Sequence, residues 1–224
     1  ATANGLIFND DATLTIAPTD ADKREGQAGS TPFTFTITRI GDPRIPVTVD
    51  WAVTNVTTDA ADFVGLTSGQ ASFGVNQATA LVTVNVAGDT ALEADETFTV
   101  TLTSPSAPAV FTAGGGTATG RISNDDASVS ISSATITDDE GNAGNTVFQF
   151  TVTRTGDTSG ITTVDWAVTG SGANAANAAD FGGTLPFGTA TFPAGSLLGS
   201  TTQTFDVNVS GDMTIEPNEG FTVT

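Results

Sequence analysis

Carboxylate side chains gather in a few stretches of this 224-residue chain, and they are the residues best suited to chemistry. The densest set is Glu93, Asp95 and Glu96, three acids within four positions. Like charges held this close repel one another unless a cation neutralises them. Calcium takes about six to eight oxygen ligands, which carboxylates and carbonyls of several loops can supply. The spacing favours a calcium site over the alternative, in which Asp and Asn cap turns and the Glu side chains are merely solvated.

The composition narrows the chemistry that these acids could serve. The chain contains neither Cys nor His, which excludes disulfides, thiolate or imidazole metal sites, and Ser-His or Cys-His catalysis. It has 25 acidic against 6 basic residues and a formal net charge of −19. A chain of that charge repels nucleic acid and anionic membranes, so we expect neither as a partner. No apolar run reaches transmembrane length, and we expect no membrane insertion.

The sequence repeats itself. TVDWAVT occurs at 48–54 and again at 163–169, and VAGDTALEADETFTVT at 86–101 resembles VSGDMTIEPNEGFTVT at 209–224. The offset between the copies grows along the chain, which places insertions in polar, Gly-rich stretches that surface loops tolerate. Repetition at this spacing predicts a tandem array of domains.

The two repeats are cut out of phase. GTATGRISNDD at 116–126 closes the first copy, and TANGLIFNDD at 2–11 has the same pattern. We expect a longer array in which the polypeptide continues; the alternative is head-to-tail strand addition, in which residues 2–8 of one molecule complete the second repeat of the next. The predicted parts are residues 1–11 as the final strand of a preceding repeat, 12–126 as the first repeat, and 127–224 as a second repeat that lacks its last strand or strands.

Apolar and polar residues alternate through most of each repeat. Phe33, Phe35 and Ile37, for example, alternate with threonines, and a period of two is typical of a strand with one buried face. About seven such strands per repeat predict an all-β fold, with a two-sheet antiparallel sandwich in each repeat.

Two further features follow from the same alternation. Trp51 and Trp166 fall on inward positions in the middle of strands, and we predict that they are core residues. Gly-Asp-Pro at 41–43 and Gly-Asp-Thr at 156–158 each follow a strand, and we predict that they form hairpin turns.

The acids recur at equivalent places in both repeats. In the first repeat they are Glu25; Asp62; Asp89; Glu93 with Asp95 and Glu96; and Asp125 with Asp126. In the second they are Glu140; Asp180; Asp212; and Glu216 with Glu219. The fifth place of the second repeat lies past Thr224, and Asp10 with Asp11 represents the fifth place of the preceding repeat.

These motifs follow one another in the order E-G … V-D-W-A-V-T … A-D-F … G-D-x-x-x-E-x-x-E-x-F-x-V-x-L … G-x-I-x-N-D-D, which spans nearly the whole chain. This order resembles the Calx-beta repeat, known from sodium–calcium exchangers and from long bacterial surface proteins. The resemblance implies that the predicted sandwiches are immunoglobulin-like. The expected fold is therefore all-β, with tandem immunoglobulin-like antiparallel β-sandwiches of about seven strands each.

The resemblance also implies Ca²⁺ as the cofactor. Two departures from the family pattern, Asn124 before Asp125 and Asn218 in place of Asp95, imply fewer or more weakly bound ions. The ligands that the resemblance implies are Glu25, Asp62, Asp89, Glu93, Glu96, Asp125, Asp126, Glu140, Asp180, Asp212, Glu216 and Glu219.

The expected function is structural. The pair Asp125 and Asp126 lies where one repeat passes into the next, so a bound ion would limit bending at the junction. We expect a calcium-binding structural repeat of an extracellular or cell-surface array, filament or adhesin stalk. Its expected partners are neighbouring repeats of the same chain or identical subunits.

Two other classes of function are weighed against this expectation. A carbohydrate- or protein-binding adhesive module without a calcium requirement would need exposed aromatic side chains on loops. An enzyme is disfavoured: paired carboxylates can hydrolyse glycosides, but catalytic sites seldom recur in every copy of a repeat. The aromatic residues to inspect are Phe63, Phe181, Phe187 and Phe192.

Overall fold

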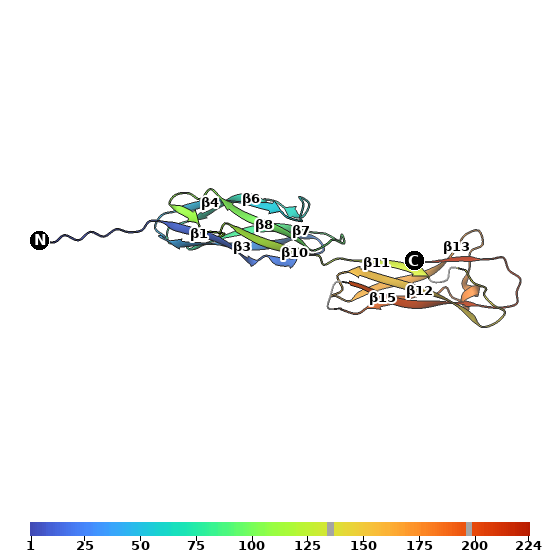
Figure 1. Cartoon of the computed structure of the whole chain (residues 1–224). Helices are drawn as coiled ribbons and strands as arrows, with labels where there is room; N and C mark the ends of the chain where they lie inside the picture. Colours follow the sequence, from blue (N-terminus) through green and yellow to red (C-terminus); the bar gives the residue numbers. More distant parts are fainter. Residues whose placement is uncertain (134–136, 196–198) are drawn as a thin grey trace. The chain divides into compact units, whose positions relative to one another are not determined.

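The computed structural model describes residues 1–133, 137–195 and 199–224, and most of these residues lie in strands (Figure 1). The chain divides into two compact units, which we call the first domain (residues 1–126) and the second domain (residues 127–224). The sequence repeat places its boundary at the same residues, Asp126 and Ala127. Within the described part of the chain, no helix is long and apolar enough to cross a membrane.

The first domain consists of two five-stranded sheets. Seven of the strands have six residues or more, and three are shorter. The first sheet has the order β5 (Phe63–Val64), β7 (Thr79–Gly88), β3 (Gly29–Gly41), β1 (Ala12–Asp20), β9 (Ala109–Phe111). The second has the order β2 (Asp22–Arg24), β10 (Thr117–Ser123), β8 (Glu96–Thr103), β4 (Val47–Asn55), β6 (Ser68–Phe73). The prediction of an all-β, immunoglobulin-like sandwich is confirmed.

The core of the first domain lies between these sheets and follows the predicted alternation. Phe33, Phe35 and Ile37 of β3 are fully buried, and the threonines between them are half-buried. Phe98 of β8 is also fully buried. Its ring makes edge-to-face contacts with the rings of Phe33, Phe35 and Phe63, with centroids 5.9, 5.9 and 5.2 Å away. This aromatic centre holds the two sheets together.

Two short pairings are parallel, in contrast with the predicted antiparallel sandwich. β1 pairs with β3 antiparallel but with β9 parallel, and β10 pairs with β8 antiparallel but with β2 parallel. The cause is a crossing: at the buried Ala21 the chain leaves the first sheet, so β1 and β2 belong to different sheets. The crossing carries Glu25 to the end of β10, because Arg24 pairs with Ser123.

The segments at 41–43 and 156–158 are not hairpin turns, so that prediction is wrong. β3 and β4 belong to different sheets, and the same holds for β12 and β13 of the second domain. Each segment therefore passes from one sheet to the other.

A buried arginine shapes each of these connections. Arg154 is fully buried, and its guanidinium donates to the carbonyl oxygens of Gly160 and Pro193 at 2.9 and 3.2 Å. It also lies over the ring of Phe192, 5.3 Å from the centroid. Arg39 has the corresponding place in the first domain and likewise donates to loop carbonyls. These bonds satisfy backbone groups that a hairpin would pair within a sheet.

The described part of the second domain has six strands and one short 3₁₀ helix, η1 (Ala178–Phe181). Trp166 stacks on Phe205 with centroids 3.9 Å apart; like Trp51 in the first domain, it packs against the core while partly exposed. One sheet has the order β11 (Ala127–Ser133), β12 (Asn145–Gly156), β15 (Gly199–Ser210). The other has the order β14 (Phe187–Phe192), β13 (Thr162–Ser171), β16 (Gly220–Val223).

Residues 1–11 carry no strand, although the sequence predicts one there. All eleven residues are exposed, and the segment leads into β1 as an extended stretch (Figure 1). A strand needs a neighbour for its backbone hydrogen bonds, and no described strand pairs with this segment.

Candidate metal centre

Four segments bring the predicted ligands of the first domain to one end of its sandwich. They are the segment after β2, the loop before β5, the loop between β7 and β8, and the segment after β10. Antiparallel pairing places the end of one strand beside the start of its neighbour, as Ile122 of β10 lies beside Glu96 of β8. The carboxylates form two groups, and within each group one oxygen per residue lies within 4.8 Å of the others. We name them the Glu25 group (Glu25, Asp125, Asp126) and the Glu96 group (Asp62, Glu93, Glu96).

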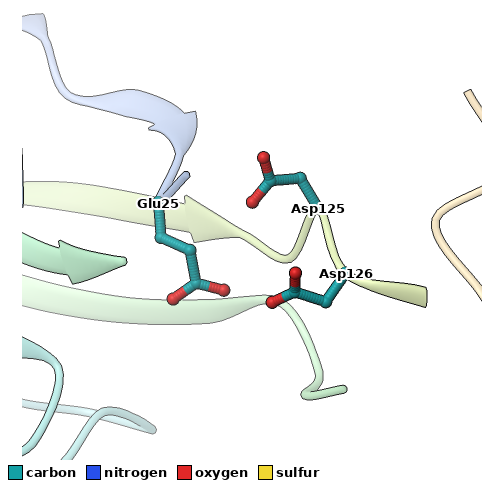
Figure 2. Close-up of side chains that lie close together, drawn as sticks. All are labelled: Glu25, Asp125 and Asp126. Carbon is teal, nitrogen blue, oxygen red and sulfur yellow. The ribbon is translucent and has the colours of Figure 1, made fainter. Parts of the chain in front are cut away.

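The Glu25 group is the more buried of the two. Glu25 and Asp126 are 4% and 2% exposed. Figure 2 shows the carboxyl groups of Glu25 and Asp126 facing each other, with the carboxyl group of Asp125 nearby, and one oxygen of each residue lies within 4.8 Å of the others. Three acids at one enclosed place repel one another when they are ionised. The arrangement therefore needs either bound protons or a cation.

One oxygen atom of the Glu25 group is left without a hydrogen bond. Oδ2 of Asp126 is buried and has no hydrogen-bond partner. A buried carboxylate oxygen without a partner is costly and is rare in folded proteins. Oxygen-only donors of this kind suit a hard cation such as calcium. The residues present thus fit the ion that the family resemblance implies.

Backbone contacts hold this group in place. The N–H of Gly26 donates to Oδ1 of Asp125 at 3.1 Å, and Nε2 of Gln27 donates to the carbonyl oxygen of Asp125 at 3.0 Å. Gly88 passes so close that a Cβ on it would lie 2.3 Å from the carbonyl oxygen of Gly26. Only glycine fits there, which explains why a glycine precedes Asp89.

The Glu96 group lies at the start of β8. Asp62 shares a side-chain hydrogen bond with Glu96, and its Oδ2 accepts from the N–H of Asp59 at 2.5 Å. Asp59 is not among the predicted ligands, but its charge contributes to the raised pKa values of Glu93 and Glu96. The second repeat has a polar residue, Asn177, at the position equivalent to Asp59, three residues before Asp180, and this correspondence could have pointed to Asp59.

Asn124 connects the two groups. It is buried; its Oδ1 accepts from the N–H of Glu93 at 3.3 Å, and its Nδ2 donates to the carbonyl oxygen of Asp126 at 3.1 Å. Asp95 accepts from the N–H of Asn124 at 3.1 Å and pairs with Arg121. Asn124 and Asp95 therefore position the loops, and neither belongs to a metal group.

Asp89, a predicted ligand, lies outside both groups. Its Oδ1 accepts from the N–H of Ala91 at 2.7 Å, which closes a turn. Its charge nevertheless raises the pKa values of Glu25, Glu93 and Asp126. Asp89 is therefore an electrostatic neighbour of both groups.

Burial and mutual repulsion make the two groups hard to ionise. Burial, followed by the charges of Glu93, Asp89, Asp126 and Asp125, raises the pKa of Glu25 to about 7. Burial and the neighbouring Asp62 raise the pKa of Glu96 to about 7 as well. Near neutral pH, a cation would compete with protons for these carboxylates.

The second domain contains one corresponding group, Asp180 with Glu216 and Glu219, within the same 4.8 Å. A hydrogen bond with Asp180 and partial burial raise the pKa of Glu219. The predicted ligands Glu140 and Asp212 are not part of this group among the described residues. Their charges do raise the pKa of Glu216, after burial. Among the described residues of the second domain, no carboxylate group corresponds to the Glu25 group.

The raised pKa values predict how pH acts on the calcium-free chain. A carboxyl group whose pKa is higher in the folded than in the unfolded state stabilises the fold below the unfolded value, near 4.5, and loses that contribution as pH rises through about 7. We expect the first domain without calcium to melt at a lower temperature at about pH 8 than at about pH 5. Calcium affinity should change in the opposite direction, rising with pH as protons leave. Calorimetric melting and calcium titration at both pH values check this; a melting temperature independent of pH would contradict it.

Comparison with known proteins agrees with this architecture. The family model described as Calx-beta domain matches the chain twice, over residues 8–126 and 122–224. The chain is similar to the crystal structure of CBD12 from CALX1.2, with 20% sequence identity and a TM-score of 0.50. The match covers 88% of this chain and 74% of the CBD12 chain. The calcium binding domain CBD12 of CALX1.1 is 24% identical, with a TM-score of 0.43 over 78% and 67% of the two chains. The search of curated proteins gave no match.

The family match covers both domains, and the motifs that carry the resemblance lie on the strands and loops described above. At 20% identity, the likeness to CBD12 from CALX1.2 supports the shared tandem fold. The chain belongs to the Calx-beta domain family.

Proposed function

We propose that this protein is a calcium-binding structural repeat, in which Ca²⁺ holds together the loops at one end of each domain. The observation that carries the proposal is the Glu25 group, where Oδ2 of Asp126 is buried without a partner among converging carboxylates. Its other two carboxylates come from the segment after β2 and from Asp125. An ion there would link the sheet crossing near Ala21 to the last strand of the domain.

The Glu96 group would hold a second ion in the first domain. Asp62 belongs to the loop before β5, and Glu93 and Glu96 belong to the β7–β8 loop and the start of β8. Because Asn124 bonds to both Glu93 and Asp126, occupancy of one group should favour occupancy of the other. The group of Asp180, Glu216 and Glu219 would hold an ion in the second domain.

Isothermal titration with calcium tests this proposal. The wild-type chain is expected to bind calcium, and Glu25→Gln and Glu96→Gln are each expected to remove binding at their own group. Asp50→Asn is the matched control, because Asp50 lies on β4, accepts from Nε2 of Gln70 at 2.8 Å and belongs to neither group. Equal binding by all four proteins would refute the assignment of ligands.

We further propose that the protein acts as a spacer in an extracellular or cell-surface array, filament or adhesin stalk. Asp126 is the last residue of the first domain, and β11 begins at the next residue. An ion that binds Asp125 and Asp126 would restrict the chain just before the second domain. Small-angle scattering in calcium and in excess chelator checks this, since a stiffened junction should give a narrower distribution of conformations in calcium. Identical profiles would argue against stiffening.

The aromatic residues give little support to a carbohydrate- or protein-binding adhesive module. Phe192 is fully buried, and Phe63 and Phe181 pack against the cores of their domains. Phe187 is 80% exposed and Phe8, with Arg44 over its ring, is 64% exposed, but isolated exposed rings are normal on a protein surface. We therefore propose that the carboxylate groups bind calcium rather than catalyse a reaction.

A further inference from the structure

A second buried oxygen of the first domain has no hydrogen bond. Thr58, in the loop before β5, is 6% exposed, and its Oγ1 has no hydrogen-bond partner among the described residues. A buried hydroxyl without a partner costs free energy that an apolar side chain of the same shape would not. Only two other buried side-chain atoms in the described part of the chain share this property, Oδ2 of Asp126 and Nε of Arg39. Asp126 belongs to the Glu25 group, and the hydroxyl of Thr58 is the other unpartnered oxygen.

Hydrogen bonds hold Thr58 beside the start of β8, where the Glu96 group lies. The preceding residue, Thr57, accepts at its Oγ1 from the N–H of Thr97 at 2.8 Å. The N–H of Thr57 donates to the carbonyl oxygen of Thr97 at 3.1 Å. Thr97 directly follows Glu96 on β8. The loop is therefore fixed to the strand that supplies one carboxylate of the group.

The residue after Thr58 contacts the same group. The N–H of Asp59 donates to Oδ2 of Asp62 at 2.5 Å. The charge of Asp59 also contributes to the raised pKa values of Glu93 and Glu96. Both chain neighbours of Thr58 are thus tied to the Glu96 group, which places Thr58 between two of the segments that carry its carboxylates.

The second domain builds the same turn without a hydroxyl. Ala176 lies four residues before Asp180, as Thr58 lies four residues before Asp62. The N–H of Asn177 donates to Oδ2 of Asp180 at 2.6 Å, which is the same bond as in the first domain. Ala176 is 8% exposed, so an apolar side chain can be buried at this position while the turn is kept. The fold therefore does not require the hydroxyl of Thr58.

We propose that the hydroxyl of Thr58 is a neutral oxygen ligand of a cation bound by the Glu96 group. Calcium takes about six to eight oxygen ligands, and three carboxylates reach the lower end of that range only if each binds through both oxygens. A hydroxyl supplies a further oxygen without a further negative charge, so it adds no repulsion among the acids. The ion in turn is a partner for the buried Oγ1. This inference rests on the proposed calcium function and adds a ligand from outside the acidic residues.

Calcium titration of the Glu96 group alone tests this ligand. Glu25→Gln combined with Glu216→Gln disables the other two groups and serves as the background. In this background, Thr58→Val keeps the shape of the side chain but removes the hydroxyl, and it should weaken calcium binding by about tenfold or more. Thr58→Ser keeps the hydroxyl and should retain most of the affinity. If the γ-methyl group acted through packing instead, the order of the two variants would be reversed.

Melting in excess chelator distinguishes a ligand from a residue that only supports the fold. Thr58→Val should then melt at a higher temperature than the background, because it replaces a buried hydroxyl that has no partner. Thr57→Val is the matched control, since the hydroxyl of Thr57 has a partner in the N–H of Thr97. Removing that hydroxyl should lower the melting temperature. The two neighbouring threonines are therefore expected to respond with opposite sign.

The outcomes separate the ligand assignment from calcium binding itself. Equal calcium binding by the background and by Thr58→Val would overturn the assignment and leave the calcium function of the group intact. Weak binding by Thr58→Ser, or a lower melting temperature of Thr58→Val in chelator, would also overturn it, because Thr58 would then act through packing. A background that binds no calcium would refute both the Glu96 group and its proposed ligand.

Discussion

Asp126→Asn is expected to stabilise the calcium-free protein and to remove most of the stabilisation that calcium provides. The carboxylate is buried with one oxygen unpartnered, so replacing it with a neutral amide relieves repulsion from Glu25 and Asp125. The wild type should gain about 2.7 kcal/mol in its free energy of unfolding when free calcium is a hundred times the dissociation constant. The variant should gain far less, because the ion loses a charged ligand.

The two effects of opposite sign distinguish a metal ligand from a turn-capping residue. Differential scanning calorimetry of the wild type and Asp126→Asn, each in chelator and in calcium, gives the four melting temperatures. A residue that only capped a turn would leave the variant less stable in both conditions. Asp165→Asn provides a control, because Asp165 on β13 accepts from Thr189 and belongs to no metal group.

Phe98→Ala is expected to lower the free energy of unfolding of the first domain by about 3–5 kcal/mol. Phe98 is fully buried and its ring contacts Phe33, Phe35 and Phe63. Because Glu96 begins the same strand, calcium affinity should fall together with stability.

The equivalent substitution in the second domain supplies the comparison. Phe221 is only partly buried, whereas Phe98 is fully buried. Phe221→Ala should therefore cost less, about 1–3 kcal/mol. Chemical denaturation that resolves the two domains measures both changes. Equal losses would show that Phe221 is as well packed as Phe98.

Much of the fold could be predicted from local sequence alone. Alternation around Phe33, Phe35 and Ile37 identifies a strand and its buried face, because side chains of a strand point to opposite sides in turn. The duplicated motifs place the domain boundary, since each copy carries one full set of core positions. The segments at 41–43 and 156–158 were assigned wrongly, because a Gly-Asp turn is compatible with either a hairpin or a passage between sheets. The buried arginines that distinguish the two cases act through carbonyls distant in sequence, such as that of Gly74.

The sequence predicted which acidic residues belong to the candidate site, but not which of them lie together in the folded protein. Twelve acids were identified from repetition and family resemblance, yet the structure brings nine of them into three groups and leaves Asp89, Glu140 and Asp212 outside among the described residues. Glu25 and Asp125 are far apart along the chain, and they meet because the chain crosses between the sheets at Ala21 and because β10 ends beside β2. No local pattern encodes that meeting.

The sequence by itself determined the strands, the duplication and the supply of oxygen ligands, because these depend on residue type and on periods of two along the chain. The tertiary structure decided which carboxylates converge, how deeply they are buried, and that Asp126 keeps one oxygen without a partner. Burial and proximity depend on which distant strands pair, and that pairing is a property of the folded sheets rather than of any single segment.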